Sequence, residues 1–237
     1  MDDTALVIIA RAPEPGKTKT RLARSIGNEA TVLLYRAFLK DLALRFSETD
    51  APYTLHWAYS PAYVDYNALL EELVPGKGQH MRSFPQEGQD FNTRLHHIFR
   101  WTERWGFHKT ILLGSDSPHI RRQIIDEVNE RLNTTDVVLG PAEDGGYYLL
   151  GMRQAHDIFS GIPMSTDVVT QMTIDAAHRQ RLSVHLVEQL QDVDELPDLL
   201  KLAEILQAKP GLAPITAAHL VTHPALTKAF SRTKESV

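Results

Sequence analysis

Cationic side chains crowd one stretch near the N-terminus, where Lys17, Lys19 and Arg21 follow the segment Arg11-Ala-Pro-Glu-Pro-Gly16. Two prolines and a glycine stiffen this turn. Lysine attracts an anion as a point charge, and arginine can bind two oxygen atoms at once. The stretch therefore predicts a binding site for the phosphates of a nucleotide or of another polyanion, and a solvated basic turn is the alternative interpretation.

The same stretch imitates the end of a P-loop. Gly16-Lys17-Thr18 matches the last part of that motif, which also requires a glycine five residues before Gly16. Arg11 occupies that position in this chain. A P-loop nucleotide hydrolase is therefore disfavoured.

Asp116 follows the apolar residues 109–113, within the segment Gly114-Ser-Asp-Ser-Pro118. A carboxylate at the end of a buried strand can bind Mg²⁺, which needs one or two carboxylates and takes its other ligands from water and substrate phosphates. The alternative is a turn-forming or helix-capping aspartate, because Ser117 suits an N-cap and Pro118 suits the first position of a helix. A serine hydrolase is disfavoured, since the chain has no Gly-x-Ser-x-Gly elbow.

Two acidic segments later in the chain carry further candidates. In Gly140-Pro-Ala-Glu-Asp-Gly-Gly-Tyr-Tyr148, the adjacent glycines permit close approach of a ligand, and Asp144 could accept a hydrogen bond from an acceptor or a sugar hydroxyl. A β-turn between two strands is the alternative there. In residues 192–198, Asp192 or Asp194 could enter a metal shell, and a capped surface helix is the alternative.

Buried strands and amphipathic helices must position these residues. Residues 5–10 form a continuous apolar, β-branched run, which is typical of a strand buried on both faces of a parallel sheet. The first helix is expected to bury Leu33 and Leu34, and a later helix to bury Phe91. We predict further strands at residues 53–59, 80–84, 109–113, 136–139, 147–152 and 183–187, and helices at 27–47, 64–73, 90–105, 166–178 and 196–207.

Strands that alternate with helices of this length predict a single-domain α/β fold, a three-layer αβα sandwich around a mainly parallel sheet. Residues 1–210 are the predicted catalytic domain, and residues 211–237 a helical appendage with a polar tail. Ligands of such open sheets bind outside the carboxyl ends of the strands, and Asp116 is expected at that edge of a central strand.

The composition narrows the class of protein. The 237 residues are 43% hydrophobic and contain 13 glycines, 13 prolines and no cysteine, which excludes collagen-like, disordered and disulfide-scaffold proteins as well as thiolate chemistry. A net charge of −5 does not suit a general nucleic-acid binder. No apolar run is long enough to span a bilayer, and the N-terminus lacks the basic region of a signal peptide, so a cytoplasmic location is expected.

Four motifs together resemble a bacterial family of GT-A-like glycosyltransferases, the nucleotide-diphospho-sugar transferases. The motifs are Arg11-x-Pro-x-Pro-Gly-Lys-x-Lys-Thr-Arg-Leu22, Gly-x-Asp-x-Pro118, Pro-Ala-x-Asp-Gly-Gly-Tyr-Tyr148 and Asp-Val-Asp194. The segment Gln86-x-Gly-x-Asp-Phe-x-x-Arg-Leu95 is also similar, and the resemblance covers residues 5–207. The layout is similar as well to small-molecule nucleotidylyltransferases, including the phospholactate and molybdenum-cofactor guanylyltransferases.

This resemblance implies a Rossmann-like nucleotide site with Mg²⁺ or Mn²⁺ on Asp116. Asp194 is the expected second ligand and Asp192 its competitor, because related chains often read Asp-Thr-Pro-Glu-Asp-Leu where this chain has Asp194-Glu-Leu-Pro-Asp-Leu199. Lys19 and Asp116 are the expected catalytic residues, and Lys19 is expected to contribute more to nucleotide binding than Lys17. The nucleotide is assigned to Ala10, Arg11, Pro13, Gly16, Lys17, Lys19, Arg21, Gln86 and Ser115, and the acceptor to Asp144, Gly145, Gly146 and Tyr147.

The predicted function is metal-dependent transfer from a nucleotide-activated donor, such as a nucleotide sugar, to a small-molecule acceptor. A nucleotidylyltransferase that releases pyrophosphate from a nucleoside triphosphate is the first alternative. The second is a non-catalytic nucleotide sensor, which would bind nucleotide without any dependence on metal. No nucleic acid is expected among the partners.

Overall fold

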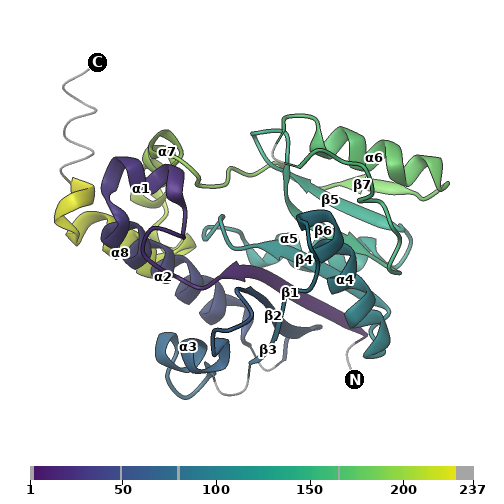
Figure 1. The fold of residues 1–237 in the computed structure, drawn as a ribbon, viewed down its shortest axis with the longest axis horizontal. Helices are drawn as coiled ribbons and strands as arrows, with labels where there is room; N and C mark the ends of the chain where they lie inside the picture. The colour runs from purple at the N-terminus through teal and green to yellow at the C-terminus, as the bar shows by residue number, and fades with distance from the viewer. Residues whose placement is uncertain (1–2, 49, 79–80, 165, 228–237) are drawn as a thin grey trace.

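A seven-stranded sheet forms the centre of the computed structural model, which describes residues 3–48, 50–78, 81–164 and 166–227 (Figure 1). The strands lie in the order β3-β2-β1-β4-β6-β5-β7. Only β6 runs against its neighbours, since it is antiparallel to β4 and to β5 while the other pairs are parallel. The strands are Thr4–Arg11 (β1), Thr54–Ser60 (β2), Arg82–Pro85 (β3), Lys109–Gly114 (β4), Val137–Pro141 (β5), Tyr147–Met152 (β6) and Val184–Leu186 (β7).

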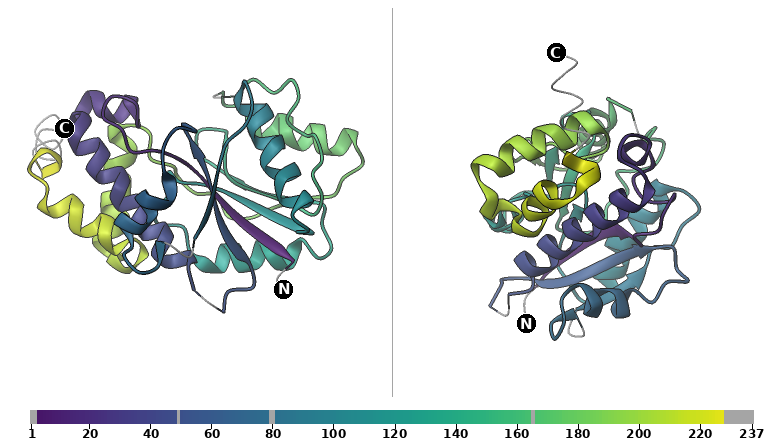
Figure 2. Two further views of the ribbon diagram at one scale, coloured as in Figure 1. Left: turned by 60° about the horizontal axis from the view of Figure 1, so that its bottom comes forward. Right: turned by 90° about the vertical axis from the view of Figure 1, so that its left-hand side faces the viewer.

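Helices cover both faces of this sheet (Figure 2). One face packs on α4 and α6, and the other on the remaining helices, so the predicted three-layer αβα sandwich is confirmed. The helices are Thr20–Ile26 (α1), Asn28–Phe46 (α2), Tyr66–Leu73 (α3), Phe91–Arg104 (α4), Arg122–Arg131 (α5), Val169–Arg179 (α6), Leu196–Ala208 (α7) and Pro214–Thr222 (α8), with a 3-10 turn at Pro210–Leu212.

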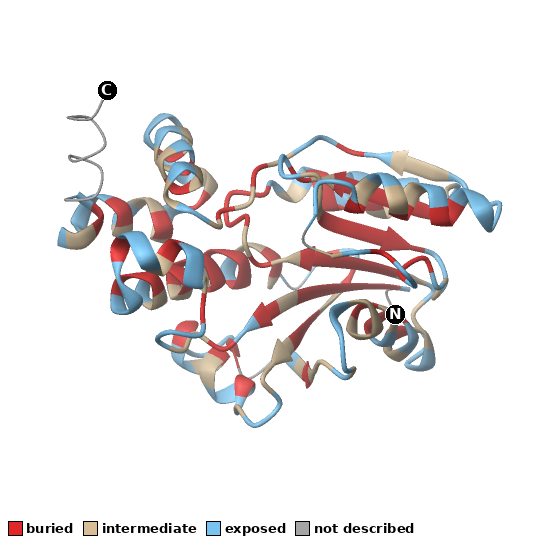
Figure 3. Ribbon diagram, turned by 45° about the horizontal axis from the view of Figure 1, so that its top comes forward, coloured by how far each residue is buried: buried red, intermediate tan, exposed pale blue. Residues whose placement is uncertain are grey.

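The first strand explains why the sheet is buried on both sides. Along β1, Leu6 and Ile8 join the apolar core on the α2 face, and Ala5 and Val7 join the core on the α4 face. Successive side chains of a strand point to opposite faces. The predicted continuous apolar run therefore fills both cores at once, and the central strands are buried over most of their length (Figure 3).

Two helices depart from the sequence-based expectation. In the first predicted helix Leu34 is buried as expected, but Leu33 is 47% exposed, and Tyr35, which is 2% exposed, also lies on the buried face. The helix expected to start at Ser117 and Pro118 instead starts at Arg122. Ser117 does not cap a helix, since its hydroxyl donates to the carbonyl of Gln191 over 3.0 Å. The short helix α1 was not predicted, and the helix expected after Pro118 is α5, four residues later than its predicted start.

A buried carboxylate joins the C-terminal helix to α2. Asp41 accepts hydrogen bonds from the backbone N–H groups of Ile215 and Thr216, at 3.0 and 2.8 Å, in the first turn of α8. Arg45, one turn later, donates to the carbonyls of Pro118 (2.8 Å) and Leu212. The described residues after 210 thus pack on α2, while His80 and the predicted tail from 228 to 237 lie outside the described residues. Among the described helices, none is long and apolar enough to cross a membrane.

Candidate active site

The basic loop and Asp116 meet at the same edge of the sheet. The loop of residues 12–19 follows β1, and Asp116 lies two residues beyond the end of β4. These strands are adjacent and parallel, with Ile9 opposite Gly114. The predicted position of Asp116, at the carboxyl end of a central strand, is confirmed.

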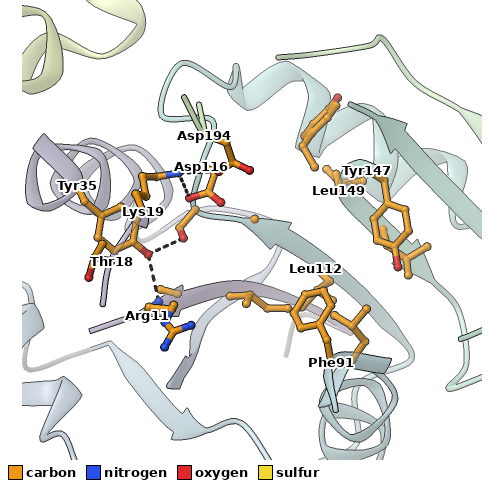
Figure 4. A pocket seen from close by; sticks show the side chains of 17 residues that line it. Arg11, Thr18, Lys19, Tyr35, Phe91, Leu112, Asp116, Tyr147, Leu149 and Asp194 are labelled. Atoms are coloured by element: carbon orange, nitrogen blue, oxygen red, sulfur yellow. Dashed lines mark hydrogen bonds and ion pairs between the residues drawn. The ribbon is translucent and has the colours of Figure 1, made fainter. Parts of the chain in front are cut away.

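The ammonium group of Lys19 stands between two carboxylates. Its Nζ atom lies 2.7 Å from Oδ1 of Asp116 and 3.5 Å from Oδ1 of Asp194, and it donates to the carbonyl oxygen of Val193 over 2.6 Å. The lysine side chain is 5% exposed, whereas each carboxylate side chain is 43% exposed. The acids therefore face solvent on one side and share a buried cation on the other (Figure 4).

The backbone of Lys19 takes an unusual conformation to make this contact. Its φ and ψ angles are 42° and 55°, in the left-handed region, at the residue that precedes α1. This region is unfavourable for a residue with a side chain. The rings of Tyr35 and Phe38 lie 5.9 and 6.0 Å from the ammonium nitrogen, which favours the charge further.

The other cations of the loop differ in how they are paired. Lys17 is bound by Glu14 at 3.3 Å and by the hydroxyl of Tyr63 at 3.1 Å, on the surface. By contrast, the guanidinium groups of Arg11 and Arg21 have no hydrogen-bond or ion-pair partner among the described residues. Both line a cavity of about 590 Å³ together with Lys17, Lys19, Thr20, Asp144, Thr166, Asp167 and Asp194.

Hydrogen bonds anchor the start of the basic loop to its neighbours. The hydroxyl of Tyr35 accepts the backbone N–H of Arg11 at 3.1 Å and pairs with the hydroxyl of Ser115 at 2.8 Å. Gln86 donates its side-chain amide to the carbonyls of Ala10 (3.3 Å) and Ala58 (2.9 Å), at the ends of β1 and β2. These contacts fix the loop relative to Asp116.

Pro13 and Gly16 belong to the turn that carries Lys17 and Lys19. Gly16 has a φ angle of 74°, which a residue with a side chain rarely adopts. The hydroxyl of Thr18 closes the turn by donating to the carbonyl of Ala12 at 3.1 Å and accepting from the N–H of Glu14 at 2.9 Å.

Backbone hydrogen bonds hold the acidic segment 192–198 against Asp116. The N–H of Val193 donates to the carbonyl of Asp116 at 3.1 Å, and Asp198 accepts the N–H of Asp194 at 3.1 Å. Burial raises the pKa of Asp194, and Lys19 opposes that shift. Burial and the neighbouring carboxylates, chiefly Asp144 and Asp194, raise the pKa of Asp192 to about 6. Negative charge is thus concentrated at this point of the site.

The carboxylates of Asp116 and Asp194 fit a small divalent cation. Both present hard oxygen atoms, are partly open to solvent and approach the same ammonium nitrogen. Within the described residues, no three His, Asp or Glu side chains are grouped closely enough to hold a metal by themselves. Mg²⁺ commonly binds through one or two carboxylates and completes its shell with water and substrate phosphates. These residues therefore suit such a shell.

The turn at Gly145 and Gly146 packs closely against the backbone of Asp167. Gly145 has a φ angle of 88°, and a Cβ atom there would lie 2.1 Å from the carbonyl oxygen of Asp167. The carboxylate of Asp144 accepts the N–H of Gly146 at 2.9 Å. A turn therefore joins β5 to β6, as the alternative interpretation stated, and it also places Asp144 beside the cations of the larger cavity.

A second cavity, of about 340 Å³, starts at these charged groups. Its lining runs from Lys19, Asp116 and Asp194 to Phe91 and Tyr147 (Figure 4). Phe91, which was expected to face inward, is 45% exposed. Tyr147 packs beside the apolar core under α4 and α6.

Comparison with solved structures identifies a close relative of this arrangement. A crystal structure from Desulfovibrio desulfuricans G20, of a protein that carries the name nucleotide-diphospho-sugar transferase, has 31% sequence identity and a TM-score of 0.86. The match covers 96% of this chain and 98% of that chain. The chain belongs to the family of this transferase. The resemblance seen in the sequence motifs is thereby confirmed.

More distant structures share the fold. A cytidylyltransferase from Leptospira borgpetersenii has 13% identity and a TM-score of 0.51, and covers 90% of this chain and 97% of its own. A 4-diphosphocytidyl-2C-methyl-D-erythritol synthase from Anaerococcus prevotii has 8% identity and a TM-score of 0.54, with coverage of 87% and 100%. The family described as "Uncharacterized protein conserved in bacteria (DUF2064)" matches residues 56–166. Comparison with curated proteins found no match.

Two residues of this transferase-family site were missed in the sequence. Tyr35 was absent from the predicted site, although a hydroxyl within a helical apolar face is a signal that it has a buried partner. Tyr63 carries no such signal, because its contacts with Glu14 and Lys17 span a loop. The structure brings together Lys19, Asp116 and Asp194. It also places Asp192 close enough to Asp116 and Asp194 for their charges to raise its pKa.

Proposed function

We propose that the protein transfers a group from a nucleotide-activated donor to a small-molecule acceptor, with a divalent metal on Asp116 and Asp194. One observation carries this proposal: the partly exposed carboxylates of Asp116 and Asp194 both contact the buried ammonium group of Lys19 at the edge of a cavity. Membership of the transferase family supports the reaction class. Asp192 is the alternative second ligand.

In this proposal the cations have separate tasks. Arg11 and Arg21 bind phosphate oxygens of the donor, since their guanidinium groups line the larger cavity and are free of partners among the described residues. Lys19 positions Asp116 and Asp194. Mg²⁺ or Mn²⁺, when bound, supplies a Lewis acid that stabilises the charge of the departing phosphate.

As a glycosyl transfer, the reaction forms one bond and breaks another at the anomeric carbon. An acceptor oxygen attacks that carbon, and the bond to the nucleoside diphosphate breaks with its electron pair on the phosphate oxygen. Arg11 and Arg21 stabilise that charge where it develops. Asp144 accepts a hydrogen bond from the acceptor hydroxyl, whose proton passes to solvent after transfer.

Nucleotidyl transfer is the second candidate. It is favoured by Arg11 and Arg21, whose guanidinium groups have no ion-pair partner among the described residues. A triphosphate presents more charge to Arg11 and Arg21 than a diphosphate does. A substrate phosphate would attack the α-phosphorus in line, and the bond to pyrophosphate would break. The fold shared with the cytidylyltransferases is compatible with this reaction.

The test measures products from purified protein with Mg²⁺ or Mn²⁺. One arm contains nucleotide sugars and detects a released nucleoside diphosphate, and the other contains four nucleoside triphosphates with phosphorylated metabolites and detects pyrophosphate. Asp116→Asn should abolish turnover, while Asp50→Asn, on the exposed surface, should not change it. Product formation that Asp116→Asn leaves unchanged would contradict the role given to Asp116. Metal-independent binding without turnover in both arms would contradict the proposal and favour a sensor.

A further inference from the structure

The smaller cavity has two chemically different ends. Lys19, Asp116 and Asp194 lie at one end, and Phe91 and Leu112 at the other (Figure 4). The far end is also lined by Ile9, Leu95, Tyr147 and Leu150. Its side chains belong to, or pack against, the apolar core between the sheet and α4. A single space of about 340 Å³ thus joins a charged site to an apolar slot.

The apolar slot offers little to a polar ligand. Leu112 and Leu150 are opposite each other in the β4–β6 ladder, where their backbone groups are used by the sheet. Among the described side chains at this end, the phenol of Tyr147 is the only polar one, and its hydroxyl oxygen is buried. A polar group enclosed here without a partner would lose its hydrogen bonds to water.

Phe91 shows that the slot is open to a ligand. It is the first residue of α4 and stays 45% exposed, although the next inward residues of the helix, Leu95 and Ile98, are 1% exposed. An exposed phenylalanine at the mouth of an apolar recess gains free energy when a ligand covers it.

A nucleobase is a poor occupant of this slot. Its ring nitrogens and exocyclic groups need hydrogen-bond partners, and sites that bind such groups supply them. A hydrocarbon body needs none. The charged end already provides for phosphate and metal through Arg11, Asp116 and Asp194.

We propose that the acceptor of this enzyme carries an apolar, ring-sized body, which lies against Ile9, Phe91 and Leu112, and a hydroxyl or phosphate that points to the charged end, where the two cavities share Lys19 and Asp194. This inference rests on the proposed function, because it assigns the acceptor end of that site. The slot selects the acceptor by its apolar body, and the charged end selects the donor.

The test uses benzyl alcohol and benzyl phosphate as probes of the full-length protein, with methyl glucoside, glycerol 3-phosphate and a nucleoside as polar comparisons. Intermolecular nuclear Overhauser effects should connect the benzyl ring to the methyl groups of Ile9 and Leu112. Phe91→Ala should weaken benzyl alcohol binding about tenfold or more, and Phe91→Leu should weaken it less. Leu33→Ala, which removes an exposed apolar side chain of α2, is the matched control and should have no effect.

The outcomes separate this inference from the proposed function. Benzyl contacts that are lost in Phe91→Ala support the slot whatever Asp116→Asn does to turnover. Metal-dependent turnover that requires Asp116, without benzyl contacts at Leu112, would overturn the inference and leave the function standing. Displacement of the benzyl ring by the nucleoside or by methyl glucoside would also overturn it. Melting temperatures of the variants show whether each one is folded.

Discussion

The ammonium nitrogen of Lys19 lies 2.7 Å from a carboxylate oxygen of Asp116, with the lysine side chain almost wholly buried. A lysine ammonium has three N–H groups. Asp116, Asp194 and the carbonyl of Val193 are three acceptors within its reach. We therefore expect Lys19 to act on a bound nucleotide through the two acids that it positions.

Lys19→Met should weaken binding of nucleotide with Mg²⁺ by about 1.5–3 kcal/mol, the range for hydrogen bonds to charged groups. Without the ammonium, Asp116 and Asp194 repel each other and leave their positions. Lys17→Met should have a much smaller effect, because Lys17 is exposed and paired with Glu14. Titration calorimetry measures both variants, and equal losses would contradict the separate role of Lys19.

Arg21→Met should reduce affinity for a nucleoside diphosphate and also lower the dependence of that affinity on salt. The guanidinium of Arg21 lines the larger cavity and has no partner among the described residues, so a phosphate can occupy its donors. We expect a loss of about 1.5–3 kcal/mol. Arg24→Met, on the same short helix, is the control, and an equal loss in both variants would show that only net charge matters.

Asp192→Asn should stabilise the protein at alkaline pH in the absence of added metal. The folded pKa of about 6 lies above the ordinary value of 3.8. Ionised Asp192 therefore destabilises the fold, and this loss grows as the pH rises from about 4 through 6. The variant should gain about 1–2 kcal/mol at pH 8 and nothing at pH 4. Urea unfolding at both values measures this, with exposed Asp175→Asn as control, and a gain of equal size at both pH values would refute the assignment.

Asp41→Asn should destabilise the C-terminal helix. The carboxylate accepts two backbone N–H groups in the first turn of α8, and its hydroxyl partner Thr216 is buried. Loss of a capping carboxylate of this kind costs about 1–3 kcal/mol. Urea denaturation gives the size of the effect, and hydrogen exchange should show the fastest amides in α8. Unchanged exchange there would mean that α8 is held by packing alone.

The sheet and the site edge could be predicted because their signals are local. The apolar runs of β1 and β4 identify buried strands, and loops after parallel strands must meet at one edge. Asp116 and the basic loop were therefore placed correctly from their neighbours in sequence. Their roles in binding and catalysis remain predictions.

Contacts between residues that are far apart in the sequence have no local sequence signal of this kind. Lys19 and Asp194 are 175 positions apart, and nothing near either residue specifies the other. The start of α5 shows the same limit, because Ser117 and Pro118 have the residue types of a helix start. Arg45, 73 residues from Pro118, binds the carbonyl of that proline and holds it in a turn.

The reversed direction of β6 gives the Asp116 edge of the sheet a different kind of connection. A parallel strand must return through a long crossover, but β5 and β6 are antiparallel and need only the hairpin of residues 142–146. Both ends of that hairpin open on the edge that carries Asp116. The hairpin also contacts the start of α6, because the carbonyl oxygens of Gly145 and Gly146 accept hydrogen bonds from Thr170. A change in the length of this hairpin would therefore reach the Asp116 edge and α6 directly, without passing through a crossover helix.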